Sequence, residues 1–139
     1  MRFDRLDLEK FRGDKQSSHF FRLVSPMAVQ HEFCRQFGHP SSYAFVRLEC
    51  VPADDLSFEV RALWPLTVSK EERMECERAI AESIGDMLLD GPYPHSGCAL
   101  ALVEVGYDAI GSSVYAFMQA ARSALQDLLA AKWNLVPLP

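Results

Sequence analysis

The stretch YDAIGSSVYAFMQAA, at positions 107–121, decides the fold. Its first residues favour a turn, and either Ser112 or Ser113 can cap a helix by accepting a hydrogen bond from a backbone amide. After the cap, apolar residues recur at intervals of three or four, and the alanines let such a helix approach a sheet closely. We therefore expect a bend followed by a helix that buries Val114, Phe117, Ala121, Ala124, Leu125 and Leu128.

The segment before this bend is expected to be a buried strand. Residues 98–105 read CALALVEV, an almost unbroken apolar run between Gly97 and Gly106. A run of this length between two glycines favours a buried strand over a helix.

A second helix is expected upstream, where Ser69 and Glu72 have the spacing of a capping box. In that motif each side chain bonds the backbone amide of the other residue. The helix would end at Gly91-Pro92. Its outer face would carry two ion pairs with i,i+4 spacing, Arg73 with Glu77 and Arg78 with Glu82. Its buried stripe would be Cys76, Ile80, Ile84, Met87 and Leu88.

The first half of the chain predicts strands at residues 20–24, 29–37, 43–51 and 56–64, the last two joined as a hairpin. The alternation within 43–51 places Ala44, Val46, Leu48 and Cys50 on a core face. Together with the helices, these strands predict an α+β fold, a mixed or antiparallel sheet of about four strands with two helices on one face.

The charge distribution divides the chain into two parts. Residues 1–22 carry six basic and four acidic side chains, and are interpreted as an N-terminal arm or extra strand. Residues 23–139 carry eight basic and fifteen acidic side chains, and are interpreted as one domain.

The composition is that of a globular protein, with 49% hydrophobic and 24% charged residues in a chain of 139. A net charge of -5 argues against a protein whose whole surface binds nucleic acid. No apolar run approaches the roughly 20 residues that cross a bilayer, and the N-terminus lacks the apolar centre of a signal peptide. We therefore expect a cytoplasmic protein without a membrane partner. The four cysteines form no C-x-x-C motif, and no metal or other cofactor is expected.

Catalytic motifs are missing from the sequence: it has no P-loop, no G-x-S-x-G and no H-E-x-x-H. His95 could activate the thiol of Cys98, but no adjacent carboxylate would orient it, and a buried, inert thiol is the better interpretation. Residues 111–113 could hold an anion on free amides, although simple helix capping is favoured. The acidic residues of the upstream helix are expected on a solvated face: Glu71, Glu72, Glu75, Glu77 and Glu82. The nearest approach to a base-stacking surface is expected to be core instead: Tyr43 and Phe45 beside Arg47.

Several segments resemble domain IV of the translational GTPase elongation factor G. The stretch 107–121 is similar to the family pattern Y-H-x-V-D-S-S-x-x-A-F-x-x-A-A. Residues 90–97, DGPYPHSG, resemble the family turn G-P-L-x-G between a helix and a strand. Residues 25–32 resemble the P-x-V-x-Y-R-E segment at the start of that domain, and residues 38–43 occupy the place of its G-R-G-Q-Y loop. The likeness covers about residues 25–130.

This resemblance implies the ribosomal protein S5 domain 2-like fold with a left-handed strand–helix–strand crossover. It also implies that three loops form a tip, which in the family enters the decoding region of the small ribosomal subunit. These loops would be residues 38–42, 65–69 and 106–111. The residues that would contact RNA or a partner are Gly38, His39, Ser41, Ser42, Thr67, Ser69, Tyr107, Asp108, Gly111 and Ser112.

The tip departs from the family pattern in its charge. Asp108 replaces the family histidine, Gly111 replaces its aspartate, and residues 39–41 lack its arginine. The sequence also contains no GTPase domain, so we expect no hydrolysis by this chain.

The resemblance implies a non-catalytic module associated with the ribosome or RNA, with the ribosome, rRNA or a translational GTPase as partner. The alternative is a protein-interaction or regulatory domain that kept the scaffold and lost RNA contact. A small enzyme is the third possibility, and it would need a pocket that joins His95, Cys98 or the helix start at Gly111. A basic tip would favour RNA and an acidic tip a protein, and the sequence leaves the oligomeric state open.

Overall fold

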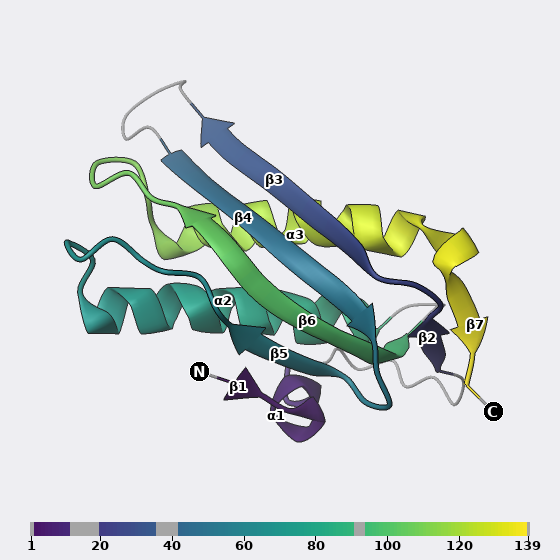
Figure 1. Ribbon diagram of the computed structural model, residues 1–139. Coiled ribbons are helices and arrows are strands. Elements are labelled where there is room, and N and C mark those ends of the chain that lie inside the picture. The colour runs from purple at the N-terminus through teal and green to yellow at the C-terminus, as the bar shows by residue number, and fades with distance from the viewer. Residues whose placement is uncertain (1, 12–19, 36–41, 91–93, 139) are drawn as a thin grey trace.

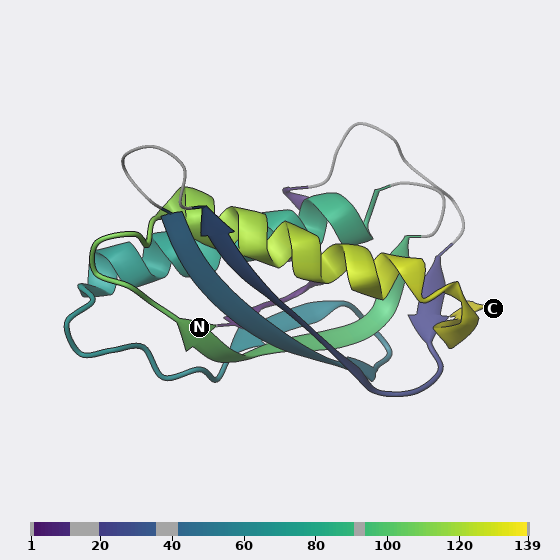
Figure 2. The same ribbon diagram turned by 90° about the horizontal axis from the view of Figure 1, so that it is seen from above.

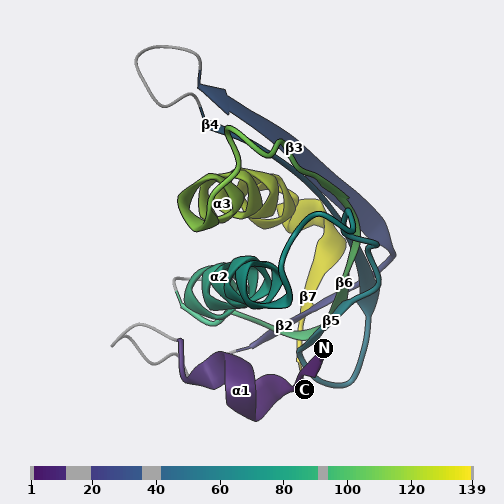
Figure 3. The same ribbon diagram turned by 90° about the vertical axis from the view of Figure 1, so that its left-hand side faces the viewer.

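One sheet carries helices on one of its faces, as Figure 3 shows from the end of the molecule. The structure, a computed structural model, describes residues 2–11, 20–35, 42–90 and 94–138. In chain order its elements are β1 (Arg2–Phe3), α1 (Arg5–Glu9), β2 (Phe21–Leu23), β3 (Met27–Arg35), β4 (Ser42–Pro52), β5 (Ser57–Val60), α2 (Lys70–Leu88), β6 (His95–Gly106), α3 (Val114–Ala130), the 3-10 helix η1 (Lys132–Asn134) and β7 (Leu135–Pro137).

The central strand is β6, which has neighbours along both of its edges (Figure 1). It pairs in parallel with β5 and antiparallel with β4, and its first residues pair in parallel with β2. Further out, β3 pairs with β4, β1 with β5 and β7 with β2. Within the described residues the mixed sheet therefore has seven strands, which corrects the expected number of about four. β1 and β7 span two or three residues, too few for an alternating pattern to show in the sequence.

The expected hairpin between residues 43–51 and 56–64 is wrong. Strands β4 and β5 form at these positions, but β6 lies between them. Leu100 and Leu102 of β6 are buried, and so is Ala101, whose side chain points to the opposite face. A strand that is apolar on both faces is better covered in the middle of a sheet than at its edge.

The core lies between the sheet and the helices α2 and α3. The predicted core face of β4 is confirmed, because Ala44, Val46, Leu48 and Cys50 are fully buried. Helix α3 is capped by Ser113, whose hydroxyl accepts a hydrogen bond of 3.1 Å from the amide of Ala116. Its buried stripe is as expected except at Val114, which is exposed in the first turn.

Helix α2 begins at the predicted place, but only half of the expected capping box forms. The Ser69 hydroxyl accepts a hydrogen bond of 3.1 Å from the amide of Glu72. The Glu72 carboxylate accepts a hydrogen bond from Tyr107. No helix in the described part of the chain is both long enough and apolar enough to span a membrane.

One acidic residue of α2 lies in the interior, contrary to the expected solvated face. Glu77 is 4% exposed, with its Oε1 3.9 Å from Nε of Arg73. Burial raises the pKa of the Glu77 carboxyl above its ordinary value, and the Arg73 guanidinium offsets part of this effect. The other expected pair is exposed, with Arg78 Nε 3.2 Å from Glu82 Oε1.

A third helix, α1, joins the two that were expected. Asp4 and Asp7 close a reciprocal capping box at its start, and its Leu8 is fully buried in the core. Gly85 of α2 permits the contact, because a Cβ there would meet the carbonyl oxygen of Leu8 and lie 3.0 Å from Cβ of Phe11. Residues 2–11 thus pack onto the rest of the molecule through both β1 and α1.

All four cysteines are free, and three of them are buried. Burial raises the pKa of the Cys76 thiol to about 12. A hydrogen bond with Cys50 raises the pKa of Cys98. Burial makes these three thiols inert, as the sequence predicts for Cys98, whereas Cys34 on β3 is exposed.

The connection from β5 through α2 to β6 is left-handed. Helix α2 runs behind the sheet in Figure 1 and returns the chain to β6, which is parallel to β5. Such crossovers are right-handed in about 98% of cases. The hand of this one is therefore a distinctive property of the fold.

Candidate functional site

Two connecting segments lie at the same end of the molecule, on the left in Figure 1. Residues 61–69 join β5 to α2, and residues 107–113 join β6 to α3. The end of β3 and the start of β4 lie at this end as well. These segments take in most of two of the three loops expected at the tip, and from here on we call residues 61–69 and 107–113 the tip.

The second tip segment is fixed by hydrogen bonds within the chain. The Asp108 amide donates to the Ser112 hydroxyl over 2.8 Å, and the Asp108 carboxylate accepts from the amide of Ile110. Ser112 in turn donates to the carbonyl oxygen of Tyr43 over 2.8 Å. The amide of Tyr43 donates to the carbonyl oxygen of Gly111. These bonds hold the bend against the start of β4.

The two tip segments are joined to each other through an aromatic cluster. The ring of Trp64 lies 6.5 Å from that of Tyr107 and 5.0 Å from that of Phe117. The Tyr107 hydroxyl donates a hydrogen bond of 2.9 Å to the Glu72 carboxylate in the first turn of α2. This hydrogen bond, followed by desolvation, raises the pKa of Tyr107. The tip is therefore a preorganised surface.

The exposed side chains of the tip are mainly apolar, with one acidic and one basic residue among them. Leu63 is 93% exposed, Leu66 is fully exposed and Ile110 is 85% exposed. Asp108 and Arg61 are exposed as well. Isolated exposed leucines are ordinary, but here three large aliphatic side chains are exposed on two loops that contact each other through Trp64 and Tyr107.

The ten residues suggested by the resemblance fall into three groups. Gly38, His39 and Ser41 lie outside the described residues. Ser69 and Ser112 use their hydroxyls in the internal bonds given above. The remaining five are described at the tip or beside it: Ser42 is half-buried opposite Arg35, Thr67 and Asp108 are exposed, Tyr107 is half-buried and Gly111 is buried.

Sequence reasoning missed the apolar residues of the tip. The segments are otherwise typical of turns, yet they contain the aliphatic residues Leu63, Leu66 and Ile110. Aliphatic residues in turn-like segments are the sequence feature that could have indicated an exposed apolar surface. Trp64 is the last residue of the strand expected at 56–64. Its role in joining the two segments depends on contacts with residues more than forty positions away.

The histidine and the cysteine considered in the sequence as a catalytic pair do not come together. His95 and Cys98 are both fully buried in β6, where a separation of three positions points them to opposite faces. No group of three or more potential metal ligands occurs among the described residues. Ser113 caps α3, as the favoured interpretation of residues 111–113 expects.

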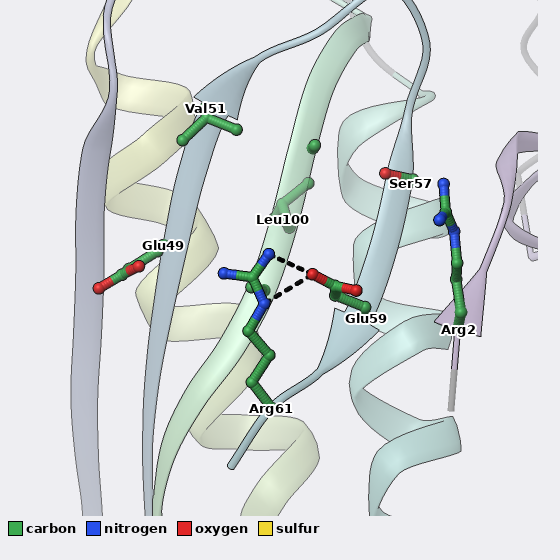
Figure 4. A pocket seen from close by; sticks show the side chains of 9 residues that line it. Arg2, Glu49, Val51, Ser57, Glu59, Arg61 and Leu100 are labelled. Carbon is green, nitrogen blue, oxygen red and sulfur yellow. Dashed lines mark hydrogen bonds and ion pairs between the residues drawn. The ribbon is translucent and has the colours of Figure 1, made fainter.

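The open face of the sheet carries a shallow hollow of about 210 Å³ above Ala99 and Ala101 (Figure 4). Four charged residues surround it, and they balance: Arg2, Arg61, Glu49 and Glu59. Arg61 pairs with Glu59 across its rim. The residues that line the hollow include no histidine or cysteine.

No protein-family model matches this sequence, and no curated protein matches it either. The fold is similar to that of ttk003000868 from Thermus thermophilus, known from a crystal structure, with a TM-score of 0.64 and 23% sequence identity. The match covers 83% of this chain but 17% of the Thermus protein, so this chain spans about a sixth of that protein's length. At this identity the likeness shows a shared α+β fold with a mixed sheet.

Proposed function

We propose that this chain is a non-catalytic module with the S5 domain 2-like fold of elongation factor G domain IV, and that its tip binds a protein partner. The fold supports this proposal through the left-handed β5–α2–β6 crossover, which few other folds have. The stretch 107–121 supports it too, because it forms a bend followed by an alanine-lined helix against a mixed sheet, as the resemblance implies.

One observation carries the choice of a protein partner: the tip exposes Leu63, Leu66 and Ile110 on segments that internal contacts hold in place. RNA is bound through basic groups on phosphates and through aromatic or arginine faces on bases. The charged residues of the tip are Arg61 and Asp108. Arg61 is paired with Glu59, and the carboxylate of Asp108 repels phosphate. The tip is thus better suited to an apolar protein surface.

Association with the ribosome or its RNA is the second candidate, favoured by the tip architecture. In the resembling family this end of the domain reaches the decoding region, and here residues 65–69 and 106–111 also lie together at one end of the sheet. A translational GTPase or a ribosomal protein would reconcile both candidates, since either offers a protein surface in the cytoplasm.

The test places a photo-crosslinking amino acid at Leu66, in the full chain and in living cells. Leu6 of α1 is a matched control, because it is also a leucine and is 71% exposed away from the tip. We expect a protein adduct from position 66 and none of the same mass from position 6. RNA adducts, or the same adducts from both positions, would contradict a protein-binding tip.

Sedimentation with purified ribosomal subunits decides the second candidate. Binding through RNA would weaken steeply as salt is raised, and Asp108→Lys would strengthen it. Binding through the apolar tip would depend weakly on salt and be lost in the triple variant Leu63→Ser, Leu66→Ser and Ile110→Ser. If the protein stays out of the pellet at every salt concentration, its partner lies outside the ribosome.

A further inference from the structure

Strand β3 leaves one edge of the sheet without a neighbour. All nine of its residues pair with β4, from Met27 opposite Cys50 to Arg35 opposite Ser42. No strand of the described residues pairs with its other edge, which lies on the outside of the molecule in Figures 1 and 2. That edge presents backbone amides and carbonyls in a row about 30 Å long.

This edge lacks most of the features that prevent strands from pairing with other chains, and its exposed charged residues are Glu32 and Arg35. Soluble proteins protect such edges with short strands, prolines, lysines or bulges. β3 is long, contains neither proline nor lysine, and keeps an unbroken register with β4. Its exposed residues between the ends are small or polar, namely Ala28, Gln30, Glu32 and Cys34.

The sequence of β3 is complementary to itself in the antiparallel direction. Pairing about His31 overlaps all nine residues and keeps each side chain on its own face of the sheet. Val29 then lies opposite Phe33 of the second copy, and Gln30 lies opposite Glu32. The oxygen of the Gln30 side chain already accepts a hydrogen bond of 2.8 Å from Arg47, which leaves the amide NH₂ to donate to that carboxylate. No like charges meet in this register.

We propose that two copies of this chain join through antiparallel pairing of their β3 strands, forming one continuous sheet across a two-fold axis at His31. The occupant of the edge is a second copy because Gln30 and Glu32 complement each other twice in the symmetric pair. This interface is separate from the tip, and the proposal does not depend on the function proposed above.

The first test measures the dimerisation constant of the full chain by analytical ultracentrifugation. Gln30→Glu places two pairs of carboxylates opposite each other and should weaken the dimer roughly two- to thirtyfold. Arg47 can pair with the new carboxylate, so the monomer should keep its fold. Adding Glu32→Lys to Gln30→Glu sets opposite charges in register and should restore the dimer.

The second test reads the register directly by disulfide formation. In the proposed register residue 28 lies opposite Cys34 of the second copy, at a Cα separation of about 5 Å that a disulfide can bridge. Ala28→Cys should therefore give a covalent dimer through a 28–34 bond on mild oxidation, identified by mass spectrometry. Gln30→Cys is the matched control, because it would lie diagonal to Cys34 at about 7–8 Å and should not crosslink.

A chain that is monomeric at every concentration, with an Ala28→Cys variant that does not crosslink, would overturn the proposal. A dimer that is insensitive to Gln30→Glu and crosslinks equally from positions 28 and 30 would also overturn it, because the contact would then lie elsewhere.

Discussion

The hydrogen bond from Tyr107 to Glu72 connects the end of β6 to the first turn of α2. It takes the carboxylate that a complete capping box would have used, so the cap of α2 rests on Ser69 alone. One residue of α2 thereby helps to place the second tip segment.

We predict that Tyr107→Phe lowers the free energy of unfolding by about 1.5–3 kcal/mol, the usual net value of a hydrogen bond to a charged group. The ring contact with Trp64 is retained in this variant, so the loss belongs to the hydroxyl. Urea denaturation at pH 7 measures the effect, and Tyr115→Phe on the exposed side of α3 serves as the control. Equal stability of Tyr107→Phe and wild type would show that the bond contributes nothing.

The same bond makes the free energy of unfolding depend on pH, and the sign of this dependence is known. The folded state holds the Tyr107 proton more tightly than the unfolded chain, because the pKa of Tyr107 is raised above 10.0. Its stabilisation is therefore fully present below pH 10.0 and is lost as the pH rises through the folded-state pKa. Tyr107→Phe should lack this alkaline loss.

Titration of Glu77 makes the free energy of unfolding depend on pH in the acidic range. Because burial raises its pKa above 4.5, the folded state binds this proton more tightly than the unfolded chain does. Stability from this group is present below pH 4.5 and falls as the pH rises through the folded-state pKa.

We predict that Glu77→Gln, which resembles the protonated carboxyl, is more stable than wild type at pH 7 and that the difference disappears in acid. Urea denaturation between about pH 4 and 7 measures it, with Glu75→Gln, exposed on the same helix, as the control. A less stable Glu77→Gln at pH 7 would mean that the ion pair with Arg73 outweighs the cost of burial.

At the scale of elements, the contact between α1 and α2 depends on a single glycine. Any side chain at position 85 would press on the backbone carbonyl of Leu8, and backbone gives way less readily than the end of a flexible side chain. The contact holds Leu8 in the core and keeps β1 at the edge of β5.

We predict that Gly85→Ala destabilises the protein by about 1–3 kcal/mol through overpacking. Alanine is the better helix former by about 1 kcal/mol, so a helix without this contact would gain stability from the same change. The sign of the change in unfolding free energy therefore decides whether α1 packs on α2 as described. Hydrogen exchange of the α1 amides should rise in parallel.

The elements that could be predicted from the sequence are those determined by local patterns. The spacing of apolar residues in α3 and their alternation in β4 predicted these elements, because each element buries one defined face. The partner of β5 could not be predicted, because the turn at 52–55 locally favours a hairpin of β4 and β5. β6 pairs with β5 instead, and it lies about forty residues further along the chain. The apolar tip was missed for a similar reason, since exposure is a property of the folded surface.

At the scale of the whole molecule, the tip and the β3 edge are separate surfaces with different chemistry. The tip offers mainly aliphatic side chains, and the edge offers backbone groups. A dimer through β3 would carry two tips, so a partner with two matching sites would be bound with greater effective concentration.

The insertion of β6 between β4 and β5 also determines the order in which the chain can fold during synthesis. The hairpin of β3 and β4 consists of local contacts and can form early, whereas β5 has to wait for residues made some forty positions later. Until then, β4 and β5 each expose backbone amides and carbonyls that have no hydrogen-bond partner. Misassembly with other nascent chains is most favourable during this interval. Slowing translation just after β6 has emerged should therefore raise the yield of native protein, and slowing it just before should lower it.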